Sequence, residues 1–237
     1  MRRIFLTLLF LVAVFDISAQ VHTTYLWHMQ QPIYWPEKSI SNPNHYQTVW
    51  ESYKIKAAGG NNYGTGVSHP TNNLQEIFGK DDRKNDYQQR VKNTVQQLLS
   101  YPEAGAQVSY SGCLIENVNS LANASQWGYY KGWNNNFVTA RGWKTSGGFP
   151  RVDMVGFTFH HALAPLISVR AFRKELEAHR LIYGNTFGHS PEYSKGFWPA
   201  ECSFSERNIE VLVEEGFQWT IVANSHLART LHDYPLH

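Results

Sequence analysis

The chain has 237 residues, of which 42% are hydrophobic, 14% aromatic and 17% charged. A chain of this length and apolar content can bury a sizeable core, which excludes a disordered or fibrous protein. The 21 basic and 19 acidic residues are not gathered into runs. The sequence therefore offers no basic face for nucleic acid. Two cysteines, Cys113 and Cys202, exclude a disulfide framework but allow either one bridge or two buried thiols.

The first nineteen residues have the pattern of an export signal. Arg2 and Arg3 precede an apolar run over residues 4–15, and the small residues Ser18 and Ala19 follow. The run is too short to span a bilayer, and no later stretch approaches the roughly 20 apolar residues that a membrane helix needs. We expect cleavage after Ala19, a mature chain of residues 20–237 without a membrane partner, and a secreted or periplasmic location.

Strand and helix patterns alternate along the first part of the mature chain. A β-branched and aromatic run at residues 23–27 predicts a buried strand that ends at His28. Residues 39–79 show no sustained period and predict a long excursion over one face. Apolar residues recur at helical spacing from 86 to 99, and residues 106–110 then predict a second strand.

The second part of the chain continues this alternation. Residues 152–159 predict a third strand and residues 162–180 a helix with a basic end. The run Gly196-Phe197-Trp198 leads to Glu201, a helix from Ser205 to Gly216 follows, and residues 217–223 predict a last strand. The pattern predicts an α/β fold, in which helices cover a parallel sheet that is either open or barrel-shaped.

Three stretches of the sequence, in their order, resemble glycoside hydrolase family 57. They are YLWHMQQP at 25–32, SGCLIE at 111–116 and GFWPAEC at 196–202, followed by SFSER at 203–207 and NSHL at 224–227. The resemblance implies an incomplete (β/α)7-type barrel, of which this chain is the N-terminal portion. It also implies a retaining hydrolase or glucanotransferase that acts on α-linked glucans such as starch or glycogen, without a cofactor. It does not choose between hydrolysis and transglycosylation.

Glu201 is the candidate catalytic residue, and the resemblance implies that it is the nucleophile. It ends a strand, where barrels place catalytic groups and where backbone N–H groups keep a carboxylate ionised. A helix-entry acid without catalytic function would occupy the same position. A retaining enzyme also needs a protonated acid roughly 5 Å away. The resemblance implies that this acid is an aspartate in a downstream sequence region. The residues that flank Asp233 do not match that region, so we expect the acid beyond His237. We therefore expect no turnover by this chain alone.

Three residues of the matched motifs are expected to bind substrate beside Glu201. By resemblance, His28 donates to a sugar hydroxyl, and Gln30 replaces a usual histidine with an amide that cannot titrate. Trp198 belongs to the same motif as the nucleophile. Glu116 has two interpretations: a substrate-binding or field-setting residue near Glu201, or a buried acid satisfied by backbone groups or an arginine.

The adjacent pair His160 and His161 follows the predicted third strand and has three interpretations. The two histidines bind sugar hydroxyls, or they are structural, or they hold zinc with a nearby carboxylate, as in carbohydrate deacetylases of related shape. Adjacent histidines rarely chelate one ion, so we assign them to substrate binding and expect no metal.

An aromatic stretch offers a further glucan surface. Trp127, Tyr129, Tyr130, Trp133 and Trp143 lie among glycines and asparagines. Sugar rings pack on aromatic planes, so one or two of these rings are expected to face solvent and the others to be core. Two other functional classes stay open: a glycan-binding module without turnover, and a metal-dependent carbohydrate deacetylase.

Overall fold

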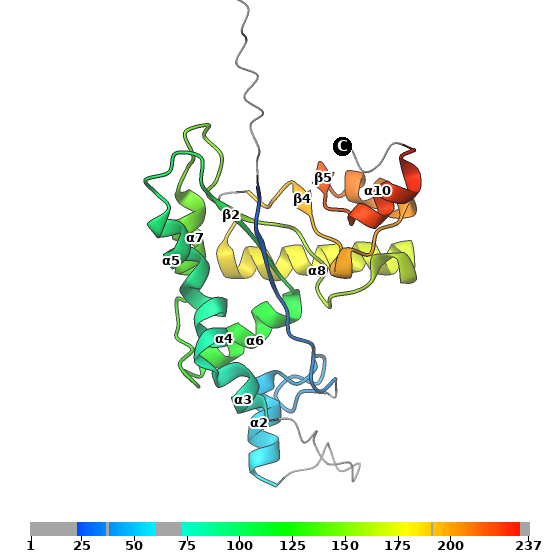
Figure 1. The fold of residues 1–237 in the computed structure, drawn as a ribbon. Helices are drawn as coiled ribbons and strands as arrows, with labels where there is room; N and C mark the ends of the chain where they lie inside the picture. The colour runs from blue at the N-terminus through cyan, green and yellow to red at the C-terminus, as the bar shows by residue number, and fades with distance from the viewer. Residues whose placement is uncertain (1–22, 37, 60–72, 191, 233–237) are drawn as a thin grey trace, which may run out of the picture.

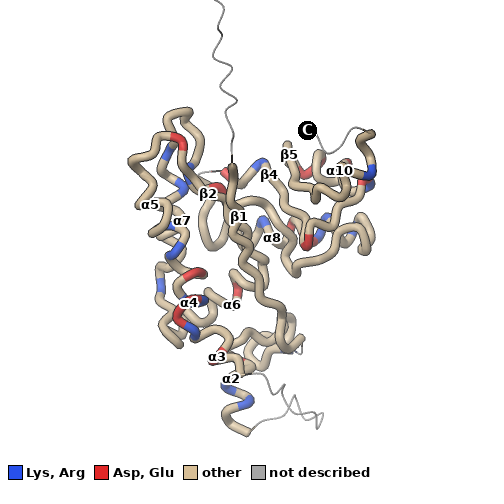
Figure 2. The backbone as a smooth tube through the Cα atoms, in the orientation of Figure 1, with Lys and Arg blue, Asp and Glu red and all other residues tan. Residues whose placement is uncertain are grey.

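The computed structural model of the chain describes residues 23–36, 38–59, 73–190 and 192–232 (Figure 1). The expected export signal and Asp233 lie outside these residues. In the part of the chain so described, no helix combines the length and the apolar character that crossing a bilayer requires. Figure 2 shows basic and acidic residues interspersed along the backbone.

Three parallel strands form the sheet that carries the site. They are β1 (Leu26–Met29), β2 (Ala106–Tyr110) and β3 (Val152–Met154), in that order, with β2 in the centre. The register places His28 opposite Ser109. Because all three strands run in one direction, their carboxyl ends lie along one edge of the sheet.

A second parallel pair continues this arrangement. β4 (Gly196–Phe197) pairs with β5 (Trp219–Thr220), and an isolated parallel bridge joins Gly156, just after β3, to Phe197. Two backbone hydrogen bonds, of 2.8 and 3.0 Å, connect Gly156 to the β4 segment. The strands therefore follow one another in space as they do in sequence, which confirms the predicted parallel α/β fold; closure into a barrel stays a prediction.

Helices connect the strands and cover the sheet. They are α2 (Val49–Ala57), α3 (Leu74–Gly79), α4 (Asp81–Asn85), α5 (Val91–Gln97), α6 (Gly112–Asn123), α7 (Asn135–Gly142), α8 (Val169–Phe187), α9 (Ile209–Glu214) and α10 (Asn224–Thr230). A π-helical turn over Asp86–Arg90 joins α4 to α5. α5 packs against α7, and α6 packs against α8 (Figure 1).

Aromatic rings fill the core beside the central strand. Tyr110, Trp133, Phe137 and Phe187 come from β2, the segment before α7, α7 and α8, and every pair of their ring centroids lies 5.4–6.3 Å apart. Such edge-to-face and tilted contacts add to the stability gained from burying large apolar surfaces. Of the aromatic stretch that we expected to meet a glucan, Tyr130 is exposed, whereas Tyr129 and Trp133 are core.

Several elements differ from the prediction. β1 is not buried, because among its four residues only Met29 is enclosed while Trp27 and His28 are exposed. The predicted excursion over residues 39–79 contains helices α2 and α3. The strands predicted at 152–159 and 217–223 shorten to β3 and β5.

The helices of the middle region also depart from the prediction. α6 and α7 were not predicted, and the helix expected from residue 162 begins only at Val169. Ser168 caps that helix through a 3.1 Å bond from Ala171 N to its Oγ, and it runs on to Phe187. Pro165 lies in a separate 3₁₀ turn, because its missing N–H suits a first turn better than a helix interior.

The two cysteines are unbridged. Cys113 is buried, and its thiol contacts the carbonyl oxygen of Gln31 at 3.1 Å. Cys202 is half-buried, so the expectation of two buried thiols holds for Cys113 alone.

Gly112 lets the first turn of α6 approach the loop after β3. A Cβ at this position would lie 2.2 Å from the Phe159 ring, next to His160 and His161. We expect Gly112→Ala to cost about 1–3 kcal/mol of unfolding free energy by overpacking. The control is Gly142→Ala in α7, which has open space and should change stability by less than about 1 kcal/mol. Urea denaturation of both variants measures this; equal stabilities would contradict the close approach.

Candidate functional site

The carboxyl ends of the parallel strands bring five residues together, which we call the strand-end cluster. His28 lies on β1 and Ser109 on β2, His161 follows β3, and Trp198 and Glu201 follow β4. Four of these were expected from the sequence to act at one site, and their common position follows from the parallel direction of the strands. Ser109 was not expected.

Two hydrogen bonds and one ion-pair contact run through the strand-end cluster. His28 Nδ1 lies 2.9 Å from Ser109 Oγ, and His28 Nε2 lies 3.0 Å from His161 Nε2. His161 Nε2 in turn lies 3.3 Å from Glu201 Oε1. Ser109 is fully buried, so this series of contacts begins inside the protein and ends at a carboxylate whose side chain is 69% exposed.

The positions of the protons follow from the chemistry of these partners. An ionised carboxylate repels the lone pair of an unprotonated ring nitrogen, so its 3.3 Å contact favours a proton on His161 Nε2. The same N–H then points at His28 Nε2, which must be an acceptor because two facing N–H groups would repel. His28 therefore carries its proton on Nδ1 and donates to Ser109 Oγ. One arrangement of protons satisfies all three contacts when both rings are neutral.

Both histidines favour the neutral form. The neighbours that shield the His28 ring from water, and to a smaller extent the charge that His161 can carry, together lower the pKa of His28 from 6.5 to about 4. Burial also lowers the pKa of His161, against the attraction of the Glu201 carboxylate, which raises it. A second proton on His28 would sit on Nε2 and face the His161 N–H, which would break the 3.0 Å contact between the two rings.

Aromatic rings wall the cluster on one side. The Trp198 ring lies 4.2 Å from the His28 ring and stacks on Phe157 at 5.3 Å with an interplanar angle of 14°. Phe157 also contacts the rings of His28 and His161, each within 5.3 Å. Trp198 is only half-buried, so part of its surface is open, three residues before Glu201 in the chain. An exposed aromatic surface next to a carboxylate suits the C–H face of a sugar ring.

Glu201 and its neighbours hold strained backbone conformations. Glu201, Cys202 and His161 have φ values of 55°, 54° and 61°, in the left-handed region that residues with a Cβ rarely adopt. Each such residue costs of the order of 1–3 kcal/mol and persists only when the surrounding structure enforces it. In the described part of the chain the Glu201 carboxylate contacts His161 as an ion pair, and the expected backbone N–H groups do not contact it.

His160 has a different partner from its neighbour. Its backbone N and its Nδ1 each lie 2.7 Å from the carboxylate of Glu175 on α8. Burial raises the pKa of Glu175, but the hydrogen bonds from His160 outweigh it and leave that pKa below its ordinary value. His160 thereby ties the loop after β3 to α8, and Nε2 is the ring nitrogen left to meet a sugar hydroxyl.

Glu116 lies in α6, and its carboxylate bonds to two side chains of the loop before α2 instead of to backbone groups or an arginine. His45 Nε2 lies 3.2 Å from one carboxylate oxygen, and the Tyr46 hydroxyl donates to the other. The interpretation as an acid satisfied by backbone or arginine is therefore wrong, and its contacts do not include Glu201. Gln30 lines a cavity of about 250 Å³ together with His28 and residues of the α4–α5 region.

No group of three or more His, Cys, Asp or Glu side chains within the described ranges is arranged to hold a metal ion. The adjacent histidines that could have formed a zinc site engage two different carboxylates, Glu175 and Glu201. Sequence reasoning missed Ser109, Phe157, Glu175, His45 and Tyr46. Only Ser109 left a signal, as a small hydroxyl near the end of a predicted strand.

A family model described as "Glycosyl hydrolase family 57" matches residues 24–235. The chain belongs to glycosyl hydrolase family 57. It is also similar to an alpha-amylase from Niallia circulans, with 31% identity over 245 residues that cover 93% of this chain and 18% of that protein. This family 57 chain thus spans less than a fifth of the length of that relative.

Two solved structures share more distant similarity with this family 57 chain. A 4-alpha-glucanotransferase from Thermococcus litoralis has 17% identity and a TM-score of 0.47 over 67% of this chain and 22% of its own. A candidate polysaccharide deacetylase from Mycobacterium smegmatis has 9% identity and a TM-score of 0.38 over 83% and 49%. Neither is close enough to define the fold.

The neutral histidines predict how stability depends on pH. The pKa of His28 falls on folding to about 4, so the unfolded chain binds more protons between pH 4 and 6.5. The buried His179, whose pKa also falls to about 4 because of burial, adds to the same effect. We expect the free energy of unfolding to fall as the pH is lowered from 6.5 to 4, as measured by urea denaturation.

Histidine titration by NMR isolates the contribution of His28. Its midpoint should lie near pH 4, and His161→Gln should raise it only partly because burial is the larger cause. A midpoint near 6.5 in the unmodified chain would show that the two rings are not packed as described.

Proposed function

We propose that this chain supplies the nucleophile of a retaining glycoside hydrolase or glucanotransferase that acts on α-linked glucans. Membership of family 57 and the similarity to an alpha-amylase support the substrate class. One observation carries the proposal: Oε1 of Glu201 lies 3.3 Å from His161 Nε2, while Oε2 has no hydrogen bond or ion pair within the described residues, in a side chain that is 69% exposed. A carboxylate fixed by one oxygen and open at the other suits attack on an anomeric carbon.

The reaction follows from this arrangement. Glu201 Oε2 attacks C1 of the glucosyl unit as the glycosidic oxygen leaves, and a protonated acid supplies a proton to that oxygen. The product is a glycosyl ester on Glu201. Water or a sugar hydroxyl then attacks C1, which releases the carboxylate and gives hydrolysis or transfer. Trp198 and His28 line the space that the reacting sugar would occupy, and His28 Nδ1–H is already committed to Ser109.

The rest of the catalytic domain belongs to the same proposal. We propose that the chain is the N-terminal part of a (β/α)7-type barrel in an exported protein, and that an aspartate beyond His237 is the acid. Without that acid the sugar leaves as an unprotonated alkoxide. Positioned proton transfer typically contributes about 10²–10⁴-fold, so natural glucans should not be turned over by this chain alone.

A substrate with a leaving group that needs no proton tests the nucleophile in the chain as it is. With 5-fluoro-α-glucosyl fluoride, Glu201 should form a bond to C1 as the C–F bond breaks and fluoride departs with the electron pair. Mass spectrometry should find one glycosyl group on Glu201. Glu201→Gln should lower the rate of labelling by roughly 10³-fold or more, because the amide lacks the attacking charge.

Glu206→Gln is the matched control, since Glu206 is an exposed acid five residues further along the chain. It should be labelled as fast as the unmodified chain. Labelling that survives in Glu201→Gln, or that maps to another carboxylate, would disprove the assignment. A chain that binds maltooligosaccharides but is never labelled would instead support a glycan-binding module without turnover.

His161 should act as a positioning residue in the same assay. His161→Leu removes the ring N–H that attracts Oε1 at 3.3 Å, and misplacing a nucleophile by about 1 Å costs up to roughly 10²-fold in rate. His161→Gln keeps a side-chain N–H and should recover part of the labelling rate, which a merely structural role would not predict. Equal rates in the two variants would exclude positioning by hydrogen bonding.

A further inference from the structure

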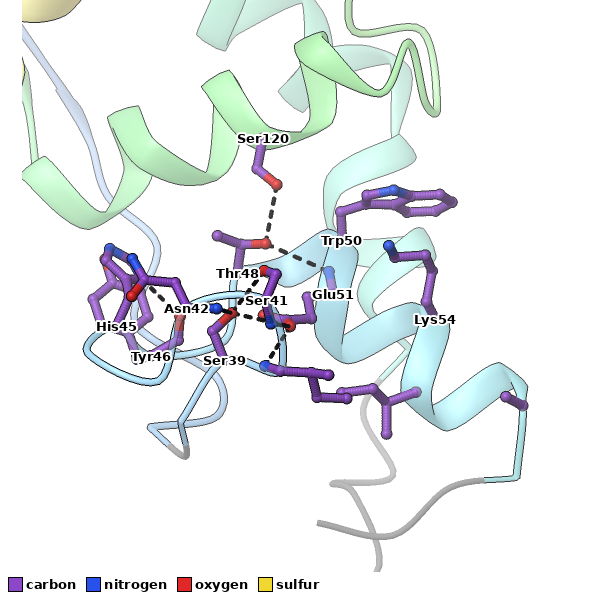
Figure 3. Close-up of a pocket in the computed structure, with 13 residues that line it drawn as sticks. Ser39, Ser41, Asn42, His45, Tyr46, Thr48, Trp50, Glu51, Lys54 and Ser120 are labelled. Carbon is purple, nitrogen blue, oxygen red and sulfur yellow. Dashed lines mark hydrogen bonds between the residues drawn. The ribbon is translucent and has the colours of Figure 1, made fainter. Parts of the chain in front are cut away.

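A cavity of about 650 Å³ lies beside helix α2, away from the strand-end cluster (Figure 3). Its walls come from the loop 39–48, from α2 and from Ser120 on α6. This volume falls within the range of pockets that bind small organic ligands. No residue of this cavity is part of the strand-end cluster.

The loop that forms one wall is folded onto a single carboxylate oxygen. Glu51 Oε1 accepts hydrogen bonds from Ser39 Oγ at 3.0 Å, Ile40 N at 2.7 Å and Ser41 N at 3.4 Å (Figure 3). A turn bond of 2.9 Å from His45 N to the carbonyl oxygen of Asn42 closes the loop. The wall is therefore pre-organised before any ligand binds, which reduces the entropic cost of binding.

Three polar groups of this cavity have no partner among the described residues. Oε2 of Glu51, Nζ of Lys54 and Nδ2 of Asn42 make no hydrogen bond or ion pair there, although Lys54 lies over the Trp50 ring at 5.8 Å. An acceptor and two donors around an indole wall match the hydroxyl groups and C–H faces of a sugar. The opposite charges of Glu51 and Lys54 favour a neutral ligand over an anion.

The cavity adjoins a motif residue of the family. His45 and Tyr46, which line it on the side opposite Trp50 and Lys54, both bond to the carboxylate of Glu116 (Figure 3). Glu116 lies in the second turn of α6, which begins just after β2, the strand that carries Ser109. Glu116 therefore connects the cavity wall to the helix that follows β2.

We infer that this cavity is a distal subsite for an α-glucan chain, which binds glucose units beyond those at Glu201. The inference rests on the proposed function, because the same polymer must occupy both places. It predicts a gain in affinity with chain length that depends on Lys54 and Asn42. Short sugars that reach only the strand-end cluster should not depend on either residue.

Isothermal titration of the purified chain with maltose and with maltoheptaose tests this inference. Lys54→Met and Asn42→Ala should each weaken binding of maltoheptaose by roughly 3- to 10-fold, the effect of one lost hydrogen bond. Binding of maltose should not change. These two exposed positions avoid the folding defect expected of Trp50→Ala, since Trp50 packs against the core.

Two further variants separate the possible failures. Lys80→Met, an equivalent loss of an exposed lysine outside the cavity, should leave both affinities unchanged, and His28→Ala should weaken both sugars. If His28→Ala weakens the binding of both sugars but Lys54→Met and Asn42→Ala leave both affinities unchanged, the distal subsite is wrong and the proposed function stands. If neither sugar binds the unmodified chain, the proposed function and the subsite both fail.

Discussion

The parallel pairing of β1 with β2 is the constraint on which the strand-end cluster depends. The register sets His28 opposite Ser109, so the imidazole meets a buried hydroxyl at 2.9 Å. A shift of one residue would turn His28 to the other face of the sheet and place Trp27 or Met29 at the cluster. With the shift, the ring would lose the acceptor that fixes its proton on Nδ1, and His161 would lose the acceptor for its own N–H.

The strain at the cluster is understandable from the same constraint. The short strands β3 and β4 end before the chain turns, and the residues that follow must bring a ring and a carboxylate to an imidazole already held by β1. His161 and Glu201 reach it with φ values of 61° and 55°. This conformation costs of the order of 1–3 kcal/mol per residue. The 3.3 Å contact between the two side chains offsets part of that cost. A cost of this kind is typical of residues held in place for function, which agrees with the proposed nucleophile.

The sequence predicted the parts of the fold that local patterns determine. Residues 106–110 form β2 as predicted, and the helical spacing after Asp86 lies within the continuous run from α4 to α5. α6 was not predicted because its first turn coincides with the motif at residues 111–116. The sequence of that motif is typical of a loop that follows a strand. α8 began late because Ser168 provides a better start than any residue before Pro165. Ser111 accepts from Leu114 N at the start of α6 as Ser168 accepts from Ala171 N at the start of α8, so in both cases a cap decided the boundary more than the apolar period did.

Site residues were predictable as a set but not as contacts. Strand-end positions in a parallel sheet converge, so His28, His161 and Glu201 could be grouped from sequence. The partners of these residues could not be predicted. Ser109 is 81 residues from His28 in the sequence. Glu175 bonds to His160 only because α8 passes the loop after β3. The pairing of Glu116 with His45 and Tyr46 likewise spans about 70 residues. These long-range pairs separate His160 from the cluster that holds His161, and they link Glu116 to the cavity beside α2.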